Sequence, residues 1–279
     1  CALPIWRLVY EAGYSSATAA LTSGVILTAF ALHLGASNLM VGVLASAPFL
    51  GQLLQAPAVA LIERWRRRKA IAVLSSVLGR SMLVLMAVAV FLPANLAIGA
   101  VVLSQFVLCG MGAVGACAWN AWLRDLVPQS RLGGIFAHRT TYTTAVSLAA
   151  GLAAALLLDR TAQGSEGRDL AFAALYLVGC ATGLISAFVI ARMPEPMMPP
   201  AGEEPVGILE LLRMPLADRN FRRLILFLSS WQFAVNLATP FFTVFIVRKL
   251  GFDMTFVMVL SVVSQVTNLI AVRSWGSLS

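Results

Sequence analysis

The chain has 279 residues, of which 59% are apolar and only 11% charged, and its mean hydropathy is +0.86. Soluble domains carry roughly 25% charged residues, so this composition excludes a water-soluble protein and predicts an all-α polytopic membrane protein. The net charge of +8 would suggest nucleic acid as a partner of a soluble protein, but here the cations follow membrane topology and no nucleic-acid partner is expected.

Apolar stretches of about twenty residues recur along the chain, and each can cross the roughly 30 Å hydrocarbon core of a lipid bilayer as a helix. The expected spans are 8–32, 39–62, 70–92, 96–123, 140–158, 170–192, 222–247 and 254–275.

The loop between the second and third spans sets the orientation of all the others. Residues 63–69 read ERWRRRK, five cations and one acid between two nearly charge-free stretches. Short loops rich in Lys and Arg stay in the cytoplasm, and most of the 20 Lys and Arg residues fall on the side of this loop. We therefore expect a cytoplasmic N-terminus in a cell membrane, and the abundance of Arg, Ala and Gly favours a bacterial inner membrane.

A polar segment, residues 193–221, interrupts the apolar pattern. Pro194, Pro196, Pro199 and Pro200 cannot continue a helix, so a cytoplasmic linker is expected here, with a short amphipathic helix over 208–216. Beyond the linker, Leu250-Gly251 at the eighth span repeats Leu34-Gly35 at the second. Repeats of this kind are a transporter architecture.

These residues resemble the major facilitator superfamily of secondary transporters. That family carries G-x-x-x-D-R-x-G-R-R-[RK] between its second and third helices, and Glu63 and Arg64 match its acid and first arginine. Its two glycines fall on Val59 and Arg66. A second copy of the pattern begins at 275–276 and stops before its acid. Further similar stretches are 125–128 with Gly133, Phe136 and Arg139, and 220–223.

The resemblance implies a fold and a domain division. Residues 1–192 would form a six-helix N-terminal bundle, 193–221 the linker, and 222–279 the first two helices of a C-terminal bundle. The chain would then be a fragment that lacks four helices.

The resemblance also implies a gating loop at the cytoplasmic face. Glu63 and Arg64 would act in a latch that holds the two bundles together in one state, with Arg124 and Asp125 as local partners. The alternative is that the loop only determines topology.

Polar side chains at helical spacing indicate a substrate pathway, because polar groups in spans turn toward neighbours or a water-filled cavity. The candidate residues are Glu11, Tyr14, Thr18 and Thr22 in the first span, Gln105 and Asn120 in the fourth, and Gln232 and Asn236 in the seventh. In the seventh span Ser229, Thr239 and Thr243 follow the same stripe. Ordinary hydrogen bonding between helices is the alternative reading.

Two charges fall inside the expected spans of the N-terminal bundle. Arg80 would lie about 15 Å deep and Glu11 about 5 Å deep, at 1.5 Å per residue. A lone charge at the bilayer centre costs on the order of 2.5–3.5 kcal/mol, so Arg80 should have an acceptor, and Glu11 is the candidate. Glu11 could bind a proton or a cationic solute, with Arg80 modulating it. A static pair, or an Arg80 bound to backbone carbonyls, is the alternative.

The predicted function is therefore transport of a small solute by alternating access, and coupling to protons is left open. A non-transporting sensor or scaffold of the same fold is the alternative. An enzyme is not expected, because His33 and His138 have no companion nucleophile or metal set, and no cofactor or metal is expected. No GxxxxGK[ST] loop appears, so ATP is not the evident energy source.

Overall fold

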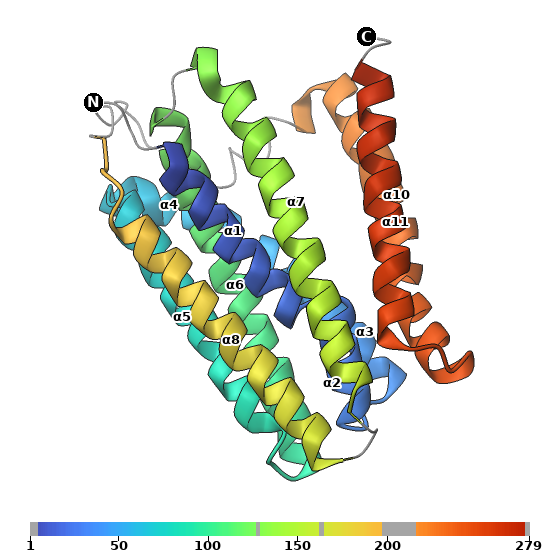
Figure 1. Ribbon diagram of the computed structural model, residues 1–279. Helices are drawn as coiled ribbons and strands as arrows, with labels where there is room; N and C mark the ends of the chain where they lie inside the picture. The colour runs from blue at the N-terminus through green and yellow to red at the C-terminus, as the bar shows by residue number, and fades with distance from the viewer. Residues whose placement is uncertain (1–4, 127–128, 162–164, 197–215, 277–279) are drawn as a thin grey trace.

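The structure is a computed structural model that describes residues 5–126, 129–161, 165–196 and 216–276. In this part of the chain all regular elements are helices (Figure 1). They are α1 (Ile5–Thr22), α2 (Val25–His33), α3 (Asn38–Gln52), α4 (Gln55–Trp65), α5 (Arg68–Ala89), α6 (Ala94–Leu126), α7 (Gln129–Asp159), α8 (Glu166–Ala191), α10 (Arg219–Val244), the π-helical η1 (Phe245–Lys249) and α11 (Met254–Gly276).

Seven helical stretches among the described residues are long and apolar enough to cross a membrane. Helix α11 is apolar over the shorter stretch Met254–Gln265. The all-α polytopic fold is thus confirmed. The first and second expected spans are each two helices, since α1 and α2 meet at a break around Gly24, and α3 and α4 meet at Leu53 and Leu54.

Helix α7 begins well before the expected start of the fifth span at residue 140. Hydropathy indicates where a helix leaves the hydrocarbon, but not where its backbone hydrogen bonding stops. The polar helical turns over 129–139 were therefore left outside the predicted span. The correction matters because it places Arg139 on a helix that faces the interior of the bundle.

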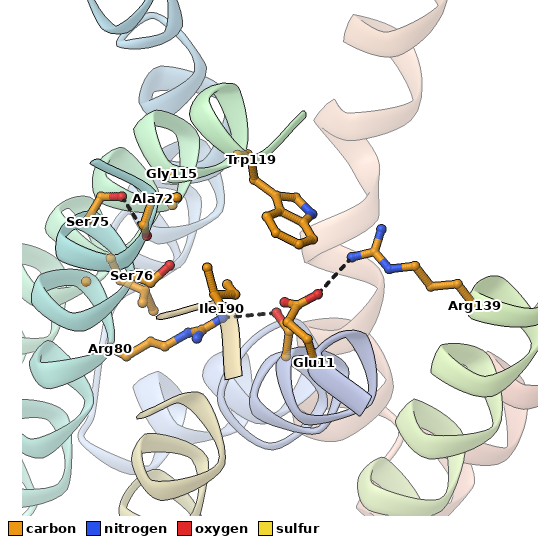
Figure 2. A pocket seen from close by; sticks show the side chains of 14 residues that line it. Glu11, Ala72, Ser75, Ser76, Arg80, Gly115, Trp119, Arg139 and Ile190 are labelled. Atoms are coloured by element: carbon orange, nitrogen blue, oxygen red, sulfur yellow. Dashed lines mark hydrogen bonds and ion pairs between the residues drawn. The ribbon is translucent and has the colours of Figure 1, made fainter. Parts of the chain in front are cut away.

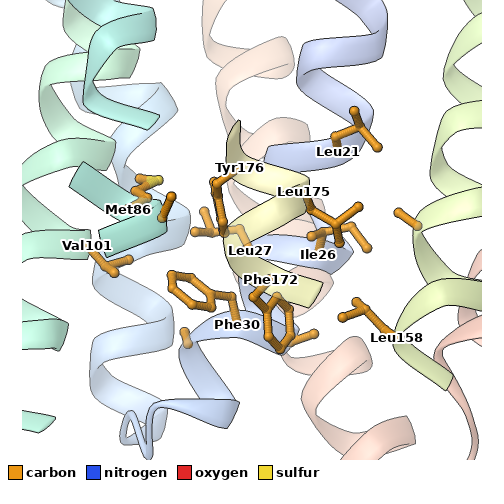
Figure 3. Packing of buried hydrophobic residues seen from close by; sticks show 14 of the residues in the cluster. Leu21, Ile26, Leu27, Phe30, Met86, Val101, Leu158, Phe172, Leu175 and Tyr176 are labelled. Carbon is orange, nitrogen blue, oxygen red and sulfur yellow. The ribbon is translucent and has the colours of Figure 1, made fainter. Parts of the chain in front are cut away.

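The N-terminal bundle is held by long helix contacts and a shared core. Helix α5 packs along α6 and α8, and α1 lies between α7 and α8. The core is richest in aromatic residues where Phe30 of α2 packs against Phe172 and Tyr176 of α8, with ring centroids 5.1 and 4.8 Å apart (Figure 3). Leu83 and Met86 of α5 belong to the same core cluster. Since lipid is as apolar as these side chains, close packing holds the bundle together more than any hydrophobic driving force.

The molecule has a basic end and an opposite end. The basic end carries residues 63–69, and the opposite end carries the turns at 34–37 and 250–253, the end of α7 and the start of α8. Helix α10 packs on α2 and α3, and α11 packs on α7. Helices α7 and α11 approach each other at the opposite end and diverge toward the basic end (Figure 1).

Gly24, at the break between α1 and α2, has φ 59° and ψ −122°, a conformation open only to glycine. We expect Gly24→Ala to destabilise the fold by about 1–3 kcal/mol and to lower the unfolding temperature in detergent. Gly99→Ala is the matched control, because Gly99 lies inside α6 and a Cβ there meets no atom within 4 Å. Equal unfolding temperatures for the two variants would contradict this account of the break.

Candidate functional site

Arg68 ties the basic end together. It is only 3% exposed, at the start of α5, and its Nη1 donates to Asp125 Oδ2 at 2.6 Å and to the Ala121 carbonyl at 2.9 Å. Its Nη2 donates to the carbonyl of Pro196 at 3.4 Å, and the backbone N–H of Lys69 donates to Glu195 Oε1 at 3.1 Å. These bonds join the start of α5 to the end of α6 and to the segment after α8.

The residues expected to gate lie beside this anchor. Glu63 and Arg64 are exposed on the last turn of α4, and Asp125 is bound by Arg68. Arg124 shares a turn of α6 with Asp125, and its side chain is outside the described part of the structure. The expected amphipathic helix 208–216 also lies almost wholly outside the described residues.

A second group of charges lies inside the N-terminal bundle, around a cavity of about 220 Å³ (Figure 2). Glu11 is 4% exposed, and its two oxygens accept from Arg139 Nη2 at 3.3 Å and from Ser186 Oγ at 3.2 Å. Arg80 donates to the Gly183 carbonyl and, at 3.1 Å, to Ser15 Oγ. Arg80 thus has backbone and hydroxyl acceptors, and the carboxylate that we expected for it is bound by Arg139.

The remaining first-span candidates turn in different directions. Thr18 and Thr22 are buried, and the hydroxyl groups of Thr18 and Thr182 lie 2.9 Å apart, which links α1 to α8. Thr22 donates to the Thr18 carbonyl at 2.7 Å. Tyr14 is 39% exposed, and Asn120 of α6 is also exposed. Thr18 and Thr22 therefore face α8 and the bundle interior, whereas Tyr14 is exposed.

Two adjoining cavities of about 270 and 530 Å³ lie between the N-terminal bundle and α10. The smaller brings together Gln105 of α6 and Asn236 of α10, and the larger adds Gln232. Gln105 is 3% exposed and its Oε1 has no hydrogen-bond partner among the described residues. Thr239 and Thr243 line the smaller cavity beside Asn236, so this stripe of α10 faces the bundle.

Contacts at the opposite end join η1 and α11 to the N-terminal bundle. Asp159, the last residue of α7, accepts from the backbone N–H groups of Met254 and Thr255 at 3.0 and 2.7 Å, where α11 begins. Arg248 of η1 donates to the Ala36 carbonyl at 3.2 Å and to Asn38 Oδ1 at 3.3 Å. Neither Asp159 nor Arg248 was a candidate site residue in the sequence analysis, because neither lies in a polar stripe of a span.

No group of three or more His, Cys, Asp or Glu side chains within the described ranges could hold a metal ion. His33 forms a pair with Asp169 at 2.5 Å at the opposite end.

The sequence matches a known protein family over nearly its full length. The model of the Major Facilitator Superfamily matches residues 12–279, nearly the full chain. The chain belongs to the Major Facilitator Superfamily. This membership makes it a multi-pass membrane protein of a family that transports solutes. No protein of curated function and no solved structure matches it significantly.

The family places a glycine at the position of Arg66, and the structure explains why. Arg66 follows α4 with φ 51° and ψ 28°, in the left-handed conformation that commonly ends a helix. Arg66 thus adopts a backbone conformation that glycine favours, at a position where the pattern has glycine.

The anchor at Arg68 gives a testable consequence. Asp125→Asn leaves the buried guanidinium without its counter-charge, and we expect a loss of about 2 kcal/mol, seen as a lower unfolding temperature in detergent. Arg64→Gln, on the exposed neighbouring turn, is the control and should leave that temperature unchanged. A similar loss in both variants would mean that removing any charged side chain at this end is destabilising, so that the pairing with Arg68 has no special part in the stability.

Proposed function

We propose that the chain carries out secondary transport of a small solute by alternating access, along a pathway between the N-terminal bundle and the helices that follow residue 221. The observation that carries the proposal is the pair of adjoining cavities, of which the smaller is lined by both Gln105 and Asn236 and the larger also by Asn236. Amides are costly to bury without partners, so an amide group with a free oxygen on a cavity wall favours a polar solute or water there. The division into a bundle (1–192), a linker (193–221) and a second bundle (222–279) belongs to this proposal.

The arrangement supports an inward-facing state. We place the basic end in the cytoplasm, together with the N-terminus, because Lys and Arg accumulate there. Asp159 and Arg248 then join the helices on the outer side, while α7 and α11 diverge toward the cytoplasm. When the protein opens outward these outer contacts have to break, and Glu63 and Arg64 would form the contacts of the cytoplasmic latch.

Labelling of single cysteines tests the pathway. With Cys1, Cys109, Cys117 and Cys180 replaced by serine, cysteines at Asn236, Thr239 and Thr243 should react with a water-soluble thiol reagent, since these residues line the smaller cavity. Ala234→Cys is the matched control, because Ala234 lies on the same helix but lines neither cavity. Saturating solute should slow labelling at the three lining positions only.

Uniform labelling along 229–243 would contradict the pathway. If the lining positions react but Gln105→Leu and Asn236→Leu leave uptake into vesicles unchanged, the cavity is not used by the solute. Labelling with no uptake of any solute class tested would favour the sensor or scaffold.

The outer contact can be tested separately. Asp159 caps the N-terminus of α11, so Asp159→Asn removes a charge from an interaction worth about 0.3–1 kcal/mol and favours the outward-open state. We expect faster labelling of Thr243→Cys by a reagent added outside the cell. Arg160→Gln, at the next residue, is the control. Labelling equally fast in both variants, or unchanged in Asp159→Asn, would contradict the outer closure.

A further inference from the structure

The cavity inside the N-terminal bundle has more positive than negative charge on its wall. Arg80 and Arg139 line it, and Glu11 is the one acid among its lining residues. Figure 2 shows Arg80 and Arg139 approaching Glu11 from opposite sides. Two guanidinium groups and one carboxylate leave one unit of positive charge. In a region of low dielectric constant an uncompensated charge is costly, so this excess needs an anion.

The hydrogen-bonding groups left over in this cavity are donors. The indole Nε1 of Trp119 and the Nε of Arg139 are buried, and neither has a partner in the described structure. Trp119 is only 8% exposed, and its indole ring lies over the cavity beside Glu11 (Figure 2). A buried donor without an acceptor costs about 1–3 kcal/mol, and two in one cavity indicate a missing acceptor.

Glu11 is a poor site for a cation in this geometry. Each of its oxygens already accepts a hydrogen bond, one from Arg139 and one from Ser186. An added cation would lie beside two arginines that line the same cavity. The carboxylate therefore serves as the counter-ion of Arg139.

We propose that this cavity binds a small carboxylate, with Trp119 Nε1 and Arg139 Nε donating to its oxygens and Arg80 supplying charge. A volume of about 220 Å³ is below the roughly 300–1,000 Å³ of drug-sized sites, so the ligand is small. A single negative charge neutralises the wall, whereas a doubly charged phosphate would overcompensate it. The inference goes beyond the proposed pathway, because the site lies within one bundle and not between the helices on either side of residue 221.

Binding to the purified protein in detergent tests this without any transport step. Titration calorimetry with propionate should give saturable one-to-one binding, and propionamide, with the same shape and no charge, should bind at least about tenfold more weakly. Inorganic phosphate should also bind more weakly than propionate. Propionamide or phosphate binding as well as propionate would overturn the proposal.

Variants assign the binding to this cavity. Trp119→Phe keeps the aromatic packing and removes the N–H, so propionate affinity should fall about tenfold. Trp122→Phe is the matched control, because Trp122 Nε1 donates to the Pro194 carbonyl at 3.2 Å and Trp122 does not line the cavity. Affinity that falls equally in both variants, or in neither, contradicts the site.

Glu11→Gln distinguishes an anion site in this cavity from a cation or proton site. Removing the one negative charge of the wall should strengthen propionate binding by about tenfold, whereas a cation or proton site would lose its ligand group. Weaker propionate binding in this variant would contradict the anion site. If Glu11→Gln does not fold, the comparison of Trp119→Phe with Trp122→Phe tests the anion site instead. Failure of either test leaves the cysteine labelling of the pathway unaffected, so the two proposals can fail separately.

Discussion

An arginine enclosed between packed helices has to find oxygen atoms there, and three arginines of the N-terminal bundle find them on another helix. Arg68 reaches α6, Arg80 reaches α8 and α1, and Arg139 reaches α1. Since an enclosed guanidinium group is costly to leave without acceptors, these bonds help to fix which helix faces which. Apolar packing fills the space between the helices, but the polar contacts specify their rotation. The same requirement creates the charged cavity.

Much of the fold could be predicted from the sequence, because the length and hydropathy of a span are properties of consecutive residues. The positions of the spans followed from them, whereas the family followed from the resemblance of the motif at 63–69 and of the shorter similar stretches. The breaks at Gly24 and at Leu53–Leu54 and the early start of α7 did not. A bend within an apolar stretch leaves the hydropathy unchanged, and polar helical turns outside the hydrocarbon look like loop. Arg66 illustrates the converse, since the family's glycine is absent while its left-handed geometry remains.

The candidate sites were harder to predict, because helical spacing shows which residues share a face but not which neighbour that face meets. Gln105 and Asn236 were both singled out, and the structure brings them to one cavity. The stripe containing Thr18 and Thr22 faces α8, whereas a wall shared with α10 was expected. Arg139 was assigned to a loop, so its pairing with Glu11, 128 residues away along the chain, was not considered. Trp119 fits the polar face of the fourth span only loosely, and the reason to single it out is a buried N–H that lacks an acceptor among the described residues.

The break between α1 and α2 lies on the wall of the smaller cavity, which Ser23 and Gly24 both line. A helix break interrupts regular backbone bonding, so in the proposed pathway main-chain groups that lack a helical partner would be open to the solute at this point. Hydrogen bonds from main-chain groups to a solute do not depend on which side chain the residue carries. If the solute passes here as proposed, alanine scanning of this wall would therefore underestimate its part in selectivity.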